Sequence, residues 1–88
     1  MKKIIIYSTL ICPYCIKAKQ LLESKNVDYQ EVRIDKHPEL VADAVKKSGG
    51  QKTVPQIFID DYHVGGCDDL YALDKEGRLD SLLGITSP

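Results

Sequence analysis

Residues 4–25, IIIYSTLICPYCIKAKQLLESK, decide the fold of this chain of 88 residues. The β-branched apolar run at the start of this stretch predicts a buried strand over residues 3–8. A proline suited to a first helical turn, followed by apolar residues at helical spacing, predicts a helix over residues 13–25. Cys12 and Cys15 therefore lie where a strand is followed by a helix.

This position favours thiol chemistry at Cys12. A cysteine directly before a helix meets backbone N–H groups without partners inside the helix and the positive end of the helix dipole. Both favour the thiolate, the form that attacks disulfides. Cys15 lies one helical turn further on, roughly 5–6 Å away at Cβ, near the spacing that a disulfide requires. We therefore predict a dithiol–disulfide exchange site with Cys15 less exposed than Cys12, although Cys15 also suits a small apolar core residue.

Composition and charge fit one compact domain, residues 1–88, with a frayed tail at residues 85–88. The hydrophobic fraction is 43%, which is enough for a core. Three cysteines, two of them in a CxxC pair, do not make a disulfide-stapled secreted fold, so we expect a cytoplasmic protein. A net charge of −1 without a basic run predicts no nucleic-acid partner. No apolar run is long enough to cross a bilayer, so we expect no membrane partner. We also expect a monomer.

The rest of the chain predicts a small α/β fold. Alternation at residues 28–34 predicts a second strand, parallel to the first because the connection between them is one short helix. The elements expected after it are a helix, an antiparallel hairpin and two more helices, at residues 38–47, 56–60 with 62–64, 67–75 and 79–83. The residues expected to face the sheet from the helix at 38–47 are Leu40, Val41, Ala44 and Val45. This order predicts a four-stranded mixed sheet with helices on both faces.

Three stretches together resemble the dithiol glutaredoxins, notably the small bacterial type: Cys12-Pro13-Tyr14-Cys15, Thr53-Val54-Pro55 and Gly65-Gly66-Cys67-Asp68-Asp69. The resemblance extends from Ile4 to Leu83 in the right order and spacing. It implies a thioredoxin-like fold, with glutathione as co-substrate and no tightly bound cofactor. It also implies transient partners, namely protein disulfides such as those of reductases, and glutathione mixed disulfides. Cys12 would be the attacking thiolate and Cys15 the resolving thiol.

The resemblance implies that one wall of a glutathione groove is formed by Thr53, Val54 and Pro55. In this family the bond before the matching proline is cis and lies beside the nucleophile. The main chain of Val54 would then pair with the tripeptide like an added strand. Tyr14 would line the same groove. Sequence alone favours an ordinary trans turn at Pro55, and it equally allows Tyr14 to be a scaffold contact.

The resemblance places the other end of glutathione at Gly66, Cys67 and Asp68. The N–H groups of Cys67 and Asp68 open a helix and can receive the γ-glutamyl carboxylate. Asp68 can pair with the ammonium group beside it. The alternative is that Asp68 and Asp69 only favour a helix N-terminus. We expect Cys67 to supply backbone, while its thiol, if exposed, would be open to oxidation or glutathionylation.

The glycyl carboxylate needs a cation, and here the sequence departs from the family. Many glutaredoxins carry a lysine three residues before the nucleophile, where this chain has Thr9. Lys52 is the candidate for the carboxylate contact, with Gln51 beside it. A solvated loop charge is the alternative for Lys52.

Competing functions fit the residues less well. Structural zinc usually needs a second closely spaced pair of ligands, which the remaining cysteine and two histidines do not form, so we expect no metal site. Some glutaredoxins bridge a [2Fe–2S] cluster between two monomers, but Pro13 argues against this within the family. Thioredoxin carries WCGPC, and this chain has no Trp. Exported disulfide-forming oxidases with a similar motif need a larger helical insertion than 88 residues leave room for.

Overall fold

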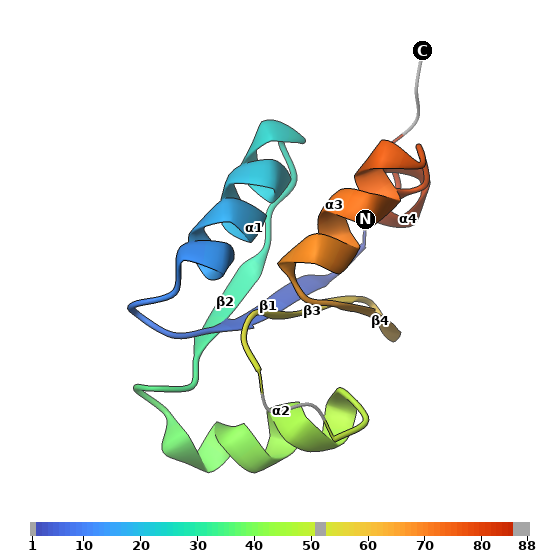
Figure 1. Cartoon of the computed structure of the whole chain (residues 1–88). Helices are drawn as coiled ribbons and strands as arrows, with labels where there is room; N and C mark the ends of the chain where they lie inside the picture. The colour runs from blue at the N-terminus through green and yellow to red at the C-terminus, as the bar shows by residue number, and fades with distance from the viewer. Residues whose placement is uncertain (1, 51–52, 86–88) are drawn as a thin grey trace.

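The computed structural model describes residues 2–50 and 53–85 and has the predicted order of elements (Figure 1). The elements are β1 (Ile4–Ser8), α1 (Pro13–Ser24), β2 (Gln30–Arg33), the short 3₁₀ helix η1 (Pro38–Leu40), α2 (Val41–Lys47), β3 (Gln56–Ile59), β4 (Tyr62–Gly65), α3 (Cys67–Lys75) and α4 (Leu79–Leu83). The strands form one sheet in the order β2-β1-β3-β4. β1 and β2 are parallel, while β3 is antiparallel to both β1 and β4. The predicted mixed sheet is confirmed.

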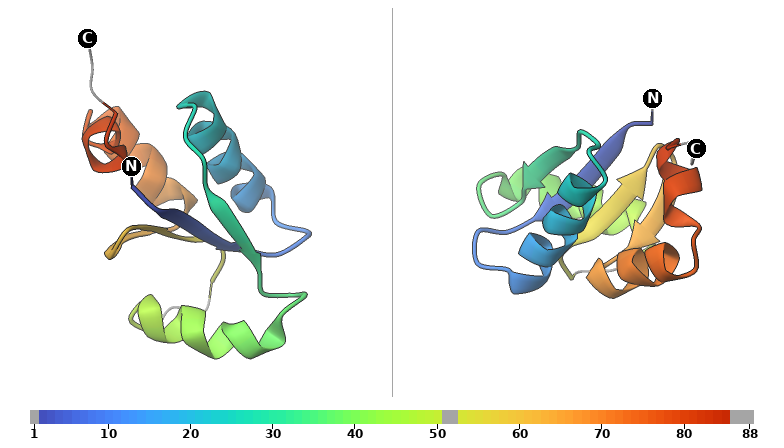
Figure 2. Two further views of the ribbon diagram at one scale, coloured as in Figure 1. Left: turned by 180° about the vertical axis from the view of Figure 1, so that it is seen from behind. Right: turned by 90° about the horizontal axis from the view of Figure 1, so that it is seen from above.

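Helices cover both faces of this sheet, as predicted. Figure 1 shows α1 and α3 on one side with α4 beside α3, and α2 on the other side; the turned views of Figure 2 keep this arrangement. Strand register explains how side chains divide between the two faces. Ile4 pairs with Ile59 and Ile6 with Ile57, so all four face the larger core under α1, α3 and α4.

The core on the α2 face is smaller. Tyr7, Ala44 and Phe58 are its buried members, and the Tyr7 and Phe58 rings meet edge to face at 5.8 Å between centroids. The predicted inner face of the helix at 38–47 is correct only in part, because Val41 is 39% exposed. The helix begins as a 3₁₀ turn and covers the sheet with few residues, so Val41 falls outside the contact.

Two predicted boundaries also differ from the structure. The second strand begins at Gln30 rather than residue 28, because the segment after the left-handed Asn26 (φ 57°) first has to cross from α1 to the sheet. Of the tail predicted at residues 85–88, residues 86–88 lie outside the described residues, and Ile85 makes contacts with the fold. Its N–H donates to the Asp80 carbonyl at 2.9 Å and its side chain packs on the main core. Within the described part of the chain, no helix has the length and apolar character needed to cross a bilayer.

Candidate active site

Cys12 is the N-cap residue of α1. Its backbone is extended (φ −150°, ψ 96°), and its Sγ accepts the N–H of Cys15 at 3.1 Å. The Ile16 N–H donates to the Cys12 carbonyl at 3.1 Å, and Pro13 occupies the first helical turn, where its missing N–H costs nothing. The helix N-terminus therefore points at the sulfur of Cys12, as the sequence predicts.

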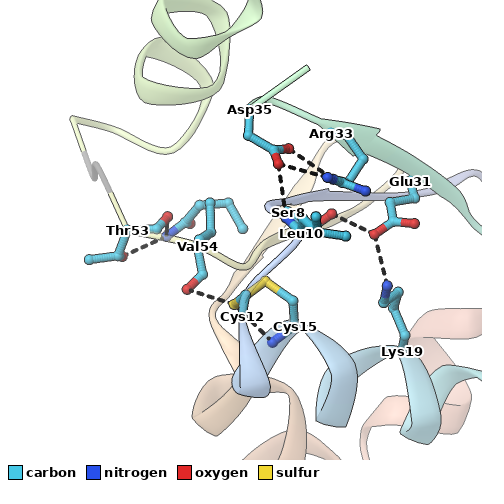
Figure 3. The surroundings of a disulfide bond; sticks show 11 residues. Ser8, Leu10, Cys12, Cys15, Lys19, Glu31, Arg33, Asp35, Thr53 and Val54 are labelled. Atoms are coloured by element: carbon cyan, nitrogen blue, oxygen red, sulfur yellow. Dashed lines mark hydrogen bonds and ion pairs between the residues drawn. A yellow bond between two sulfur atoms is a disulfide. The ribbon is translucent and has the colours of Figure 1, made fainter. Parts of the chain in front are cut away.

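Cys12 and Cys15 form a disulfide, so the structure shows the oxidised dithiol (Figure 3). Their Cα atoms are 5.2 Å apart, inside the range of ordinary disulfides. Cys12 is 7% exposed and Cys15 is 1% exposed, which confirms the predicted order. An incoming sulfur can therefore reach Cys12 more easily than Cys15.

The loop before Cys12 is tied to the end of β2. The Leu10 N–H donates to Asp35 Oδ2 at 3.0 Å, and Arg33 holds the same carboxylate with Nε and Nη2 at 2.8 and 2.7 Å. These contacts, the Arg33 guanidinium first, hold the pKa of Asp35 well below its usual range. The fixed loop leaves the side chains of Leu10 and Ile11 in solvent, 66% and 89% exposed.

A second polar contact joins β1, β2 and α1 behind the disulfide (Figure 3). The buried Ser8 hydroxyl donates to Glu31 Oε2 at 2.6 Å, and Lys19 Nζ donates to the same oxygen at 2.9 Å. The hydrogen bond from Ser8, followed by that from Lys19, lowers the pKa of Glu31.

These carboxylates predict how stability changes with pH. The pKa values of Asp35 and Glu31 are lowered from roughly 3.9 and 4.3 in an unfolded chain. Their contribution is therefore complete above about pH 4.5 and is lost as the pH falls through the folded values. We expect Asp35→Asn to be less stable than the parent near neutral pH and to lose less stability between about pH 5 and pH 2. Urea unfolding across this range measures both, and an acid limb equal to the parent's would contradict the role of the Arg33–Asp35 pair.

The N-terminus of α1 is the first wall of the site, and the segment from Thr53 to Pro55 is the second. The Val54–Pro55 peptide bond is cis, as the resemblance implies. The Val54 carbonyl oxygen lies 3.9 Å from Cys12 Sγ. The disulfide sulfur carries no proton, so this is a packing contact here, and a thiol at the same place would have an acceptor for a weak hydrogen bond.

The third wall is the start of α3. Gly66 is the N-cap, and its N–H donates to the carboxylate of Asp69 at 2.9 Å. Gly65 has φ +111°, and a Cβ there would collide with the Asp69 carboxylate, so this position requires glycine. A Cβ on Gly66 would be 3.5 Å from the Pro55 carbonyl oxygen, which shows how closely the second and third walls approach.

These walls enclose a groove of about 310 Å³ beside the dithiol. The residues that line it are Tyr14, Thr53, Val54, Pro55, Gln56, Gly66, Cys67, Asp68 and Asp69. Seven of these nine are the groove residues that the resemblance implies. Gln56 and Asp69 are not among the predicted groove residues, although Asp69 belongs to the Gly65–Asp69 motif. A polar residue opening an apolar strand and an acid three positions after an N-cap glycine are usable signals for them. The predicted contacts Gln51 and Lys52 lie outside the described residues.

The thiol of Cys67 is buried, so the exposure that would open it to oxidation is not found. Burial raises the pKa of the Cys67 thiol; the charge of Asp68 adds to this effect and that of Lys17 opposes it. The structure therefore places Cys67 in the groove wall with a thiol poorly suited to ionise. Within residues 2–50 and 53–85, no three His, Cys, Asp or Glu side chains are grouped as metal ligands.

A dithiol at a helix N-terminus, facing a cis-proline segment on a four-stranded mixed sheet, defines the thioredoxin-like thiol–disulfide oxidoreductases. The family model described as Glutaredoxin matches residues 4–64. Glutaredoxin 1 of Rickettsia prowazekii is 60% identical over 81 residues, covering 91% of this chain and 85% of the relative. The chain belongs to the glutaredoxin family and is a glutathione-dependent thiol–disulfide oxidoreductase.

Solved structures agree with this assignment. The solution structure of glutaredoxin from Brucella melitensis is 49% identical, with a TM-score of 0.81 over 99% of this chain and 96% of that chain. The crystal structure of a buckwheat glutaredoxin–glutathione complex is 29% identical, with a TM-score of 0.86 over 94% of this chain and 77% of that chain. The predicted thioredoxin-like fold is thus confirmed.

Proposed function

We propose that Cys12 is the nucleophile and Cys15 the resolving thiol of this enzyme. The observation that carries the proposal is the position of Cys12 Sγ. It lies at the N-terminus of α1, accepts the Cys15 N–H at 3.1 Å and is 3.9 Å from the carbonyl oxygen of Val54, a residue that lines the groove. Backbone donors and the helix dipole stabilise a thiolate at this point.

The exchange proceeds in two displacements. The Cys12 thiolate attacks the glutathione sulfur of a mixed disulfide, a new S–S bond forms, and the substrate leaves as a thiolate that takes up a proton. The thiolate of a second glutathione then attacks the glutathione sulfur of this intermediate, which releases glutathione disulfide and restores the Cys12 thiolate. When a protein disulfide is reduced, the Cys12 thiolate first attacks one of its sulfurs, forms a mixed disulfide with the substrate and releases the first substrate thiol. Cys15 then attacks the sulfur of Cys12, releases the second substrate thiol and leaves the Cys12–Cys15 disulfide, the bond seen in the structure. Two glutathione molecules reduce this bond in turn and leave as glutathione disulfide.

We propose that glutathione lies along the groove with its main chain against Val54. The buckwheat glutaredoxin was solved with glutathione, which supports a site for the tripeptide in this fold. The first N–H groups of α3, those of Cys67 and Asp68, face no acceptor within the helix and suit the γ-glutamyl carboxylate. Asp68 suits the ammonium group, and Lys52 with Gln51 suits the glycyl carboxylate.

We propose that protein substrates contact the exposed side chains of Leu10 and Ile11, the two residues before Cys12. We propose that the protein acts as a monomer in the cytoplasm, where glutathione keeps thiols reduced, on disulfides such as those of reductases. Glutathione is a co-substrate in this scheme, and no metal or tightly bound cofactor takes part in it.

A coupled assay tests the proposal. With glutathione and glutathione reductase present, the protein should reduce a small glutathione mixed disulfide at catalytic rates. Efficient reduction through thioredoxin reductase, without turnover by glutathione, would instead assign thioredoxin activity to the site.

The groove placement predicts a change in substrate affinity for Asp68→Asn. Removing the carboxylate that pairs with the glutathione ammonium should raise KM about 3–10-fold and leave kcat nearly unchanged, because the contact is made before and during the reaction. Steady-state kinetics with the mixed disulfide measure the two constants. Asp61→Asn is the matched control, since Asp61 is an exposed acid in the β3–β4 turn. Equal KM values in the parent and Asp68→Asn would overturn the placement.

A further inference from the structure

A hydrogen-bond network of three side chains, those of His63, Gln56 and Thr53, connects β4 to the segment at Thr53 on the α2 face of the sheet. Gln56 is 2% exposed, and its Nε2 donates to the carbonyl oxygen of Thr53 at 3.1 Å and contacts the Thr53 hydroxyl at 3.2 Å. The other end of the same amide, Oε1, lies 2.6 Å from His63 Nε2. None of these contacts involves Cys12 or Cys15.

The Thr53 carbonyl decides which atoms of this network are donors and which are acceptors. A carbonyl oxygen can only accept, so the Gln56 atom facing it must be the NH₂ group. The Gln56 oxygen then faces His63, and His63 Nε2 must carry a proton to donate to it. Both the neutral Nε2–H tautomer and the charged ring meet this requirement, so the connection does not depend on the charge of His63.

The ring of His63 is held in place by the sheet. The strand register pairs His63 with Phe58, and their rings stack with centroids 4.8 Å apart and an interplanar angle of 24°. Phe58 is buried and meets Tyr7 edge to face. Gln56 is two residues before Phe58 on β3, so both point to the same face. Packing against Phe58 therefore holds the His63 ring, and with it the Nε2–H donor, in a fixed position.

At its other end, this hydrogen-bond network reaches the groove. Thr53 and Val54 line it, and the Val54 carbonyl oxygen is 3.9 Å from Cys12 Sγ. A bound peptide that pairs with the main chain of Val54 needs that main chain fixed in one orientation. The buried Gln56 amide, anchored at Thr53 and at His63, fixes it.

We propose that Gln56 and His63 are positioning residues for substrate binding: they hold the Thr53–Val54 backbone in the orientation that glutathione requires. This proposal rests on the proposed placement of glutathione along Val54. It assigns to His63, a residue of the far strand β4, an effect on KM through Gln56 rather than a contact with the substrate.

The test is the kinetics of His63→Phe with a small glutathione mixed disulfide. Phenylalanine keeps the stacking on Phe58 but removes the donor, which leaves the buried Gln56 oxygen without its His63 partner and loosens the Thr53 contact. We expect KM to rise roughly 5–10-fold with kcat within about twofold of the parent, the loss of one buried hydrogen bond. His63→Gln retains an amide donor that can reach the Gln56 oxygen and should restore most of the parent's KM.

Two further variants separate positioning from stability. Leu83→Val shortens a side chain of the main core in α4, so it should lower stability without raising KM. Gln56→Met combined with His63→Phe should raise KM no more than Gln56→Met alone, because the two residues act as one unit. His63 is the cleaner single site, since Gln56 makes further contacts.

The proposal is overturned if KM in His63→Phe equals that of the parent, if His63→Gln shows the same rise as His63→Phe, or if Leu83→Val raises KM as much. A fall in kcat at unchanged KM would also overturn it. Failure of the glutathione placement itself gives a different result, since Asp68→Asn would then leave KM unchanged as well. A response to Asp68→Asn without a response to His63→Phe therefore rejects the positioning role alone.

Discussion

Cys12→Ser should lower kcat/KM for a glutathione mixed disulfide by a factor on the order of 10³ or more. A serine hydroxyl at this position is not ionised near neutral pH and cannot form the sulfur–sulfur bond on which both displacements depend. The helix N-terminus and the groove remain, so binding without turnover is the expected behaviour. The coupled assay measures the loss, and circular dichroism checks that the variant is folded.

Cys67→Ser is the matched control for this change. It replaces a thiol with a hydroxyl in the same groove, but the pKa of the Cys67 thiol is raised by burial, so this thiol is poorly suited to act as a nucleophile. Its backbone N–H stays in place, so most of the activity should remain. Comparable losses in the two variants would show that the assay reports damage to the groove rather than loss of the nucleophile.

Cys15→Ser should divide the two activities of the enzyme. Reduction of glutathione mixed disulfides needs only Cys12 and should stay within severalfold of the parent. Reduction of a protein disulfide through the Cys12–Cys15 bond should fall by roughly 10² or more, because the intermediate with the protein can no longer be resolved internally. Activity on both substrates is measured with the same preparation.

Mass spectrometry of Cys15→Ser identifies the intermediate. After exposure to glutathione disulfide, one glutathione should be attached, and peptide mapping should place it on Cys12. Attachment to Cys67, or loss of mixed-disulfide reduction together with protein-disulfide reduction, would contradict the assigned division of roles.

The sequence could predict those parts of the fold that depend on residues close to one another along the chain. The strand before Cys12, the helix after Pro13 and the hairpin around Asp60 follow from local patterns, and the structure confirms them. Tertiary packing decided the rest. Val41 has the right spacing for an inner helix face, yet only a narrow part of α2 meets the sheet, so its side chain stays exposed.

The candidate site was predictable for a different reason. Cys12, Val54 and Asp68 are far apart in the chain, and no periodicity brings them together; the family resemblance did. The contact between Gln56 and His63 was beyond both approaches, because it depends on the register of β3 and β4 and on the irregularity between Ile57 and Phe58. A lone histidine on a short strand does not reveal which amide it faces.

Ionisation of Cys12 near neutral pH is measured by the ultraviolet absorbance of thiolate in the reduced protein, followed against pH in the parent and in Cys12→Ser. We expect the reduced parent to contain about one thiolate near neutral pH, because the pKa of Cys12 lies below the value of roughly 8.5 of a free cysteine. Cys12→Ser should lack this thiolate. A parent that titrates like a free thiol, or the same low-pH component in Cys12→Ser, would contradict this expectation.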